Sequence, residues 1–368
     1  MFGLPGISAL TGINSHTNKH PNPSTTIYPY RRAGDAPYEI KEADLRSVIY
    51  IPKEFKYGAD GKTPVILVPG TGSYGGEAYA PNFAKLLKKS SFGDPVWLNI
   101  PGRMNDASHR NAEHVAYAIS YISAVCGRSV AIVAWSQGNL ATQWALKYWP
   151  STRLVVNNFI ALSADFHGTI QASALMPFNV GLGNPGVWSQ KRHSNFLRTL
   201  HDDNGDSAYV PTTSIYSATD EIVQPQFGTG ASAYLKDVRN VGVTNCELQQ
   251  VAVLKPAGAV YSHETVMSNP IAWALAEDAI RHGGPGRLDR IDLNRLSWKI
   301  VADGLTVADG AATEALVLSA GASILSYLWK VPMEPKIPQY ALAQLKTPVG
   351  KVEVGQQPVT VSQTEVAA

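Results

Sequence analysis

The sequence contains few cysteines and few charged residues, and both shortages limit its function. Only Cys126 and Cys246 occur in 368 residues, which excludes a disulfide scaffold and a zinc ribbon. Charged residues make up 16% of the chain, below the roughly 25% of typical soluble proteins. The 31 Lys and Arg nearly balance the 29 Asp and Glu. A protein that binds nucleic acid through bulk charge needs a basic excess, so we expect no nucleic-acid partner.

Long apolar segments are also missing. The uncharged stretch 315–329 has 15 residues and would reach about 22 Å as a helix. A bilayer core is about 30 Å thick, so we predict no transmembrane segment. The first basic residue is Lys19, and Pro5 interrupts the short apolar stretch before it, so we predict no signal peptide in this chain.

Predicted strands and helices alternate along the middle of the chain. Short β-branched runs bounded by turn residues predict strands, and apolar residues at helical intervals predict helices. Alternation of this kind is typical of an α/β protein with a mostly parallel sheet and helices on both faces. The predicted strands are 48–52, 64–69, 95–100, 129–134, 159–162, 214–216 and 248–254, and the main helices are 82–89, 111–125 and 137–148.

The two ends of the chain differ from this central region. Residues 1–44 are rich in Pro, Asn, Ser, Thr and Gly and predict an extended N-terminal arm. Residues 45–345 would form one α/β domain. Residues 346–368 include an alternating stretch that predicts a peripheral hairpin.

Ser136 lies where a buried strand runs directly into a helix. The sequence around it is Ala134-Trp135-Ser136-Gln137-Gly138, which approximates the G-x-S-x-G nucleophile elbow, a sharp turn that exposes a serine hydroxyl above the sheet. Alanine is small enough for the first position. The alternative is that Ser136 only caps the helix, but the strand-turn-helix context favours a nucleophile.

A serine nucleophile needs a base and an acid, which α/β-hydrolases supply in the order Ser, Asp, His. Asp220 follows the strand 214–216 in a loop, where such sheets place functional groups, although an Asx-turn is an alternative. Only His263 and His282 follow Asp220. His282 ends a predicted helix, where a cation has a structural use. We therefore predict Ser136, Asp220 and His263 as a catalytic triad.

The negative charge of an ester transition state needs hydrogen-bond donors. The loop after the strand 64–69 is rich in glycine, which lets backbone N–H groups approach a ligand. We predict that backbone N–H groups near Thr71 and at Gln137 form this oxyanion hole. The mechanism requires no metal and no cofactor.

Two other classes of function have to be weighed. Gly70 to Gly75 also matches G-x-G-x-x-G after a strand, as in dinucleotide-binding oxidoreductases. However, Pro69 lies between the strand and the glycines, and a helical pattern resumes only near Asn82. The next predicted strand runs into Pro101 without the acidic residue that would bind the ribose of a dinucleotide. A non-catalytic binding protein on the same fold is the third class.

The motifs together resemble the Candida antarctica lipase B family of fungal lipases. The resemblance extends from about Pro64 to Ala341 and implies an α/β-hydrolase that hydrolyses or transfers lipid esters. It also implies a monomer that is secreted, acts on lipid or small esters and works at a lipid–water interface. The segments that carry it are PVILVPGTG, AWSQGNLATQWAL, SADFHGT, PGVW, VPTTSIYSATDEIVQPQ and EPKIPQYA.

The resemblance also implies roles for residues around the triad. Thr71 would donate to the oxyanion through its backbone and its hydroxyl, with Gln137 as the second donor. Trp135 would form the floor of the pocket for the alcohol group. Four residues would lie near or line the acyl channel, and four more would line its entrance: Asp165, Gln190, Ile222 and Val223, and then Val317, Ala320, Gly321 and Ile324.

The chain also departs from the family pattern. Asn139 replaces a glycine after the serine motif, the residues beside His263 differ, and Cys126 matches no family cysteine. The segment 172–186 diverges where a short lid would lie. The acyl-chain preference therefore stays open, and a short-chain esterase, a polyester-directed esterase and a transacylase are alternatives on the same triad.

Overall fold

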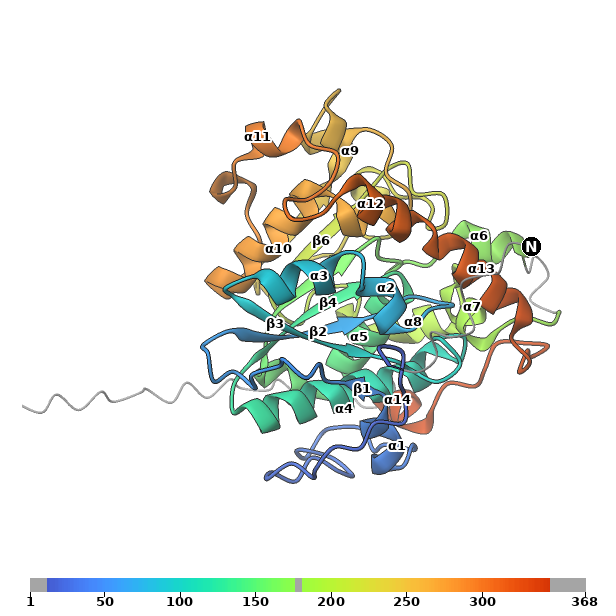
Figure 1. The fold of residues 1–368 in the computed structure, drawn as a ribbon. Helices are drawn as coiled ribbons and strands as arrows, with labels where there is room; N and C mark the ends of the chain where they lie inside the picture. The colour runs from blue at the N-terminus through green and yellow to red at the C-terminus, as the bar shows by residue number, and fades with distance from the viewer. Residues whose placement is uncertain (1–11, 176–180, 345–368) are drawn as a thin grey trace, which may run out of the picture.

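The computed structural model describes residues 12–175 and 181–344, arranged around one seven-stranded sheet (Figure 1). The strand order is β1-β3-β2-β4-β5-β6-β7. Every neighbouring pair is parallel except β1 and β3, which confirms the predicted fold class. The strands are β1 (Ile49–Tyr50), β2 (Thr63–Val68), β3 (Gly93–Leu98), β4 (Val130–Trp135), β5 (Val156–Leu162), β6 (Thr212–Tyr216) and β7 (Val243–Glu247).

Helices cover both faces of the sheet, as Figure 1 shows for α4 below it and α10 above it. The central strands are buried along nearly their whole length, which explains their continuous apolar sequences. One core cluster packs beneath α1, α4, α5 and α8, and a second packs beneath α3 and α10. These helices are α1 (Glu42–Ser47), α3 (Phe83–Lys89), α4 (Ser108–Cys126), α5 (Gln137–Tyr148), α8 (Asn195–His201) and α10 (Pro270–His282).

The remaining helices are short and lie at the margins of the sheet. A small apolar cluster joins α6, α7 and α13, which lie together at one side of the molecule (Figure 1). These helices are α2 (Gly75–Tyr79), α6 (Ile170–Leu175), α7 (Pro185–Gln190), α9 (Leu248–Val251), α11 (Leu293–Ser297), α12 (Val307–Glu314), α13 (Leu316–Ser326) and α14 (Gln339–Gln344). Within the described ranges the 3₁₀ turns are Pro150–Leu154, Asp202–Asn204, Gly228–Gly230, Pro256–Gly258, Thr265–Ser268 and Leu288–Arg290.

Two sequence predictions about local structure are wrong. The segment 248–254 is not a strand: it begins with the helix α9, and Leu254 is 98% exposed. The strand β7 lies immediately before it, forms the edge of the sheet and is only partly buried. Helical structure after β2 resumes with α2 at Gly75, earlier than predicted.

The N-terminal segment is attached to the domain along its described length. Residues 12–41 contain no helix or strand, yet Ile27, Ala36 and Tyr38 are buried in the core cluster beneath α4 and α5. Tyr38 stacks on Trp149 with ring centroids 5.4 Å apart. The predicted C-terminal hairpin lies outside the described residues.

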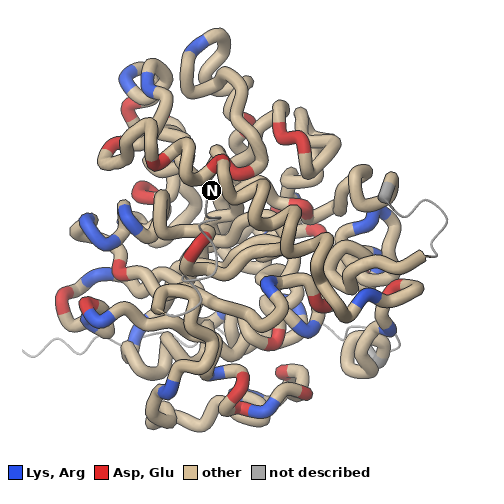
Figure 2. Tube along the Cα trace, turned by 45° about the vertical axis from the view of Figure 1, so that its right-hand side comes forward, with Lys and Arg blue, Asp and Glu red and all other residues tan. Residues whose placement is uncertain are grey.

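The surface of the molecule carries both signs of charge. Figure 2 shows Lys and Arg interspersed with Asp and Glu, with long uncharged stretches between them. Both cysteines are free thiols, with Cys246 buried. No helix in the two described ranges is both long enough and apolar enough to cross a bilayer.

Candidate active site

Ser136 occupies a strained turn between β4 and α5. Its φ of 54° and ψ of −133° lie outside the usual regions for a residue with a side chain. Its hydroxyl makes no capping hydrogen bond to α5, so the capping alternative does not describe this serine. Gly138 has no room for a side chain, because a Cβ there would lie 2.6 Å from the carbonyl oxygen of Pro69.

Asn139 holds this turn in place. Its Nδ2 donates to the carbonyl oxygen of Ser136 at 2.9 Å and to that of Leu162 at 3.1 Å. Leu162 is the last residue of the neighbouring strand β5. The side chain therefore ties the serine turn to the next strand of the sheet.

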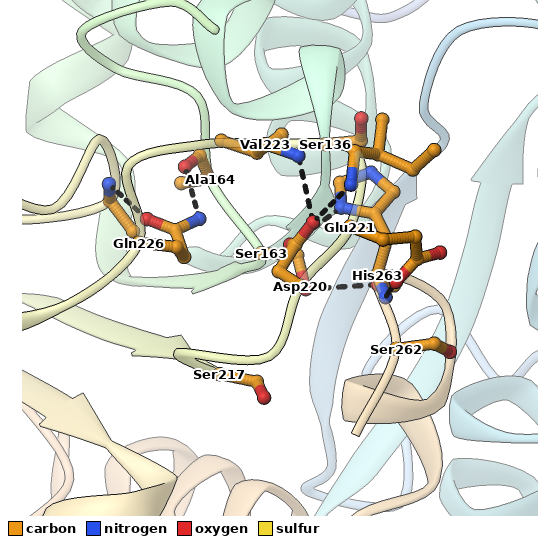
Figure 3. A network of polar contacts seen from close by, with 12 residues as sticks. Ser136, Ser163, Ala164, Ser217, Asp220, Glu221, Val223, Gln226, Ser262 and His263 are labelled. Atoms are coloured by element: carbon orange, nitrogen blue, oxygen red, sulfur yellow. Dashed lines mark hydrogen bonds and ion pairs between the residues drawn. The ribbon is translucent and has the colours of Figure 1, made fainter. Parts of the chain in front are cut away.

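Asp220 and His263 form a buried hydrogen-bonded pair (Figure 3). The His263 Nδ1 and the Asp220 Oδ2 are 2.8 Å apart. The other carboxylate oxygen of Asp220 accepts backbone N–H groups from Ile222 at 2.9 Å and Val223 at 2.7 Å. Because these bonds fix the carboxylate, the Nδ1 of His263 carries the proton and its Nε2 is left to act as a base.

The surroundings of His263 hold the ring and set its pKa. Its carbonyl oxygen accepts the Trp135 indole N–H at 3.0 Å and the Ser163 hydroxyl at 2.9 Å. Burial lowers the pKa of the imidazole, but the charge and hydrogen bond of Asp220 outweigh it, so the pKa is raised. The Nε2 has no hydrogen-bond partner among the described residues, which leaves it available to a substrate.

Ser136 and His263 open into one mostly apolar cavity of about 510 Å³. Such a cavity, with a few polar groups at one point, is typical of a small-molecule site. Its lining residues are Thr71, Trp135, Ser136, Thr169, Gln171, Ala172, Ala174, Val187, Gln190, Ile222, His263, Glu264, Val317, Ala320, Gly321 and Ile324.

Gln190 orients the hydroxyl of Thr71 at the wall of this cavity. The Gln190 Nε2 donates to the Thr71 Oγ1 at 2.9 Å and to the carbonyl oxygen of Gly186 at 3.0 Å. Because Thr71 accepts this bond, its own hydroxyl proton can point to another acceptor. Gln137 is the first residue of α5, so its backbone N–H has no acceptor within the helix.

The helix α13 closes the cavity on another side. Its lining residues recur at helical spacing, at Val317, Ala320, Gly321 and Ile324, and Leu318 and Leu325 are 76% and 77% exposed. The helix also lies against the loop of Thr71. A Cβ at Gly72, whose φ is +82°, would lie 2.6 Å from the carbonyl oxygen of Ala320.

Comparison with known proteins places this geometry in a family. No family model matches the chain. Lipase B of Pseudozyma antarctica is 32% identical over 282 residues, which cover 76% of this chain and 79% of the relative. The chain belongs to the lipase B family. The crystal structure of Aspergillus fumigatus lipase B is 49% identical, with a TM-score of 0.86, covering 89% of this chain and 78% of that one. Membership makes the chain a carboxylic ester hydrolase.

The structure gathers most of the residues predicted for a lipase B site and leaves four outside the lining. Asp220 lies behind His263, to which it is hydrogen-bonded. Val223 is fully buried and contributes its backbone N–H to Asp220 instead. Gln137 is buried, and its side chain accepts a hydrogen bond from Asn111. Asp165 is buried with no partner for either carboxylate oxygen among the described residues, and burial raises its pKa to about 7.

Several residues that line this lipase B cavity were not predicted from the sequence. Glu264 is the most unexpected, because it is only 2% exposed and carries a carboxyl group beside His263. Its position next to the predicted base was the only sequence signal. The other residues come from α6, α7 and the segment before α6, and none of them was predicted as a site residue: Thr169, Gln171, Ala172, Ala174 and Val187.

Proposed function

We propose that this enzyme hydrolyses lipid esters through a Ser136-His263-Asp220 triad. The observation that carries the proposal is the buried Asp220–His263 pair, 2.8 Å apart, whose imidazole shares one apolar cavity with the strained Ser136. This arrangement supplies a nucleophile, a base and an orienting acid, as in other serine hydrolases.

In the first half of the reaction, Ser136 is acylated. The Ser136 Oγ attacks the ester carbonyl carbon while the His263 Nε2 takes the hydroxyl proton. Backbone N–H groups of Thr71 and Gln137 and the Thr71 hydroxyl stabilise the oxyanion. The bond between the carbonyl carbon and the alcohol oxygen then breaks, and His263 returns the proton to the leaving alcohol.

Deacylation repeats these steps with water. His263 takes a proton from water as its oxygen attacks the acyl carbon, the bond to the Ser136 Oγ breaks, and the proton passes to that oxygen. The acid leaves and Ser136 is restored. Replacement of water by a second alcohol would give transacylation on the same residues.

The apolar surface around the cavity supports a lipid substrate. Leu318 and Leu325 on α13 and Leu328 and Trp329 just after it are each at least 76% exposed. Exposed apolar residues grouped beside an apolar cavity are typical of a surface that contacts a lipid phase. Membership in the lipase B family supports the further proposal that the enzyme is secreted.

A series of esters tests this function. We expect the protein to hydrolyse p-nitrophenyl esters and a triglyceride emulsion, and a fluorophosphonate to label it in proportion to lost activity. Activity on short esters without activity on the emulsion would replace the lipase with a short-chain esterase. Absence of activity on every ester would contradict the proposal.

A second prediction concerns Gln190, which we propose as a positioning residue. Gln190→Leu removes the donor that orients the Thr71 hydroxyl, so kcat should fall about tenfold with little change in KM. Thr71→Val removes the hydroxyl itself and should lower kcat by about 10²-fold, the usual effect of losing one oxyanion donor.

The double variant tests whether the two residues act together. If Gln190 works through Thr71, Gln190→Leu should have little further effect in a Thr71→Val background. Independent, multiplying losses would show that Gln190 acts only by holding the cavity wall. Thermal unfolding of all three variants checks that the fold is retained.

A further inference from the structure

Glu264 places a carboxyl group in a cavity that otherwise needs none. The residue is 2% exposed and lines the cavity beside His263 and Ser136. Its Oε2 has no hydrogen-bond partner within residues 12–175 and 181–344. A buried carboxyl oxygen without a partner is unfavourable, and the proposed triad chemistry makes no use of it.

The groups around Glu264 do not compensate its charge. Burial raises the pKa of this carboxyl to about 7, with His263 opposing and Glu221 and Glu314 reinforcing the shift. Glu221 accepts the backbone N–H of His263 at 3.2 Å, and Glu314 accepts the hydroxyl of Ser262. Two further carboxyl groups therefore add negative charge near Glu264, and its unpartnered Oε2 can accept a hydrogen bond from a group that binds here.

We propose that Glu264 accepts a hydrogen bond from a hydroxyl group on the alcohol part of the substrate ester. This inference rests on the proposed triad, because the leaving oxygen must lie within reach of the His263 Nε2 to receive its proton. Glu264 follows His263 directly in the chain and lines the same cavity. The substrates favoured here are esters of diols and polyols in which at least one hydroxyl group is free.

The expected size of the effect follows from the type of bond. A hydroxyl that donates to a carboxylate makes a charge-assisted hydrogen bond, which is stronger than a neutral one. Loss of this acceptor should reduce the preference for a hydroxylated alcohol about tenfold. The change should appear mainly in KM, because the bond exists in the ground state and in the transition state.

Three esters of nearly equal size test whether a hydroxyl group is recognised on the alcohol part or on the acid part of the substrate. Propyl butanoate carries none, 2-hydroxyethyl butanoate carries it on the alcohol, and propyl 3-hydroxypropanoate carries it on the acid. For each variant, kcat/KM for both hydroxylated esters is divided by that for propyl butanoate. These internal ratios remove differences in overall activity and in folded fraction.

Glu264→Met and Glu264→Gln are compared with Glu314→Gln, a matched change at a neighbouring exposed carboxylate. We expect Glu264→Met to lower the ratio for 2-hydroxyethyl butanoate about tenfold, Glu264→Gln to lower it less, and Glu314→Gln to leave it unchanged. Glu264→Gln keeps an acceptor oxygen and the side-chain volume, so it serves if Glu264→Met does not fold.

Three results would overturn the proposal. The first is an unchanged ratio in both Glu264 variants, and the second is an equal fall in Glu314→Gln. The third is a fall confined to propyl 3-hydroxypropanoate, which would place the carboxyl group on the acyl side. Inactivity of the unaltered enzyme on all three esters would instead refute the triad function itself.

Discussion

Ser136→Ala is expected to lower kcat/KM for p-nitrophenyl butanoate about 10⁴- to 10⁶-fold, the range found when the nucleophile of a serine hydrolase is removed. The variant should fold normally, because the hydroxyl makes no capping bond and the residue is already confined by the turn. Initial rates with thermal unfolding monitored by circular dichroism measure both outcomes.

Labelling provides an independent control for this variant. A fluorophosphonate should modify the unaltered enzyme and not Ser136→Ala, since the reagent needs an activated hydroxyl. Residual activity above about 1% in a folded Ser136→Ala protein would show that another nucleophile carries the reaction.

His263→Ala should cause a loss of comparable size, about 10⁴-fold or more. The imidazole is buried, is bonded to Asp220 and lines the cavity, so its removal takes away the base that the proposed triad needs. His282→Ala is the matched control, since His282 ends α10 and bonds to the Asp278 carbonyl oxygen at 2.8 Å. Steady-state rates of both variants should separate the two histidines.

The expected response of His282→Ala is a change of less than twofold in kcat/KM. A large loss in this variant with retained activity in His263→Ala would reverse our assignment of the base. Equal losses in both, with lowered thermal stability, would mean that folding and not chemistry was measured.

The central part of the fold could be predicted because the secondary structure that the local sequence favours is also the one that buries its apolar residues. The strand β4 is apolar at every position and fully buried, and α5 begins and ends where predicted, at Gln137 and Tyr148. A parallel sheet brings the carboxyl ends of its strands to one edge. Chain order along that edge selected Asp220 and left His263 and His282 as candidate bases, and the position of His282 at a helix end then favoured His263.

Elements at the margin of the sheet could not be predicted in the same way. The edge strand β7 has the sequence VTNCE and is half-buried, so it lacks the apolar run that marks an interior strand. The apolar run just after it belongs to α9 and a turn. The helix α2 has only five residues, and two of them are glycines. Glycine has a low helix propensity, so the sequence does not indicate a helix there.

The finer features of the site depend on contacts between distant segments. Gln190 reaches Thr71 across 119 positions of the chain, and no periodic pattern encodes that distance. Glu264 is 2% exposed although it lies in a turn, and nothing in its local sequence marks that burial. Resemblance to the family placed Gln190 near the cavity, but its hydrogen bond to Thr71 became visible only in three dimensions.

Gly72 packs closely against the Ala320 carbonyl oxygen. The helix α13 at the cavity entrance and the loop that carries Thr71 are therefore in direct contact. The Gly72 N–H is also fixed by the Arg103 carbonyl oxygen at 2.7 Å, while the Asn105 Nδ2 donates to the Ser323 hydroxyl at 3.1 Å. A displacement of α13 would therefore shift the loop that carries Thr71. Movement of the cavity entrance would therefore reach the residue that we propose as an oxyanion donor, and not only the path by which a substrate enters.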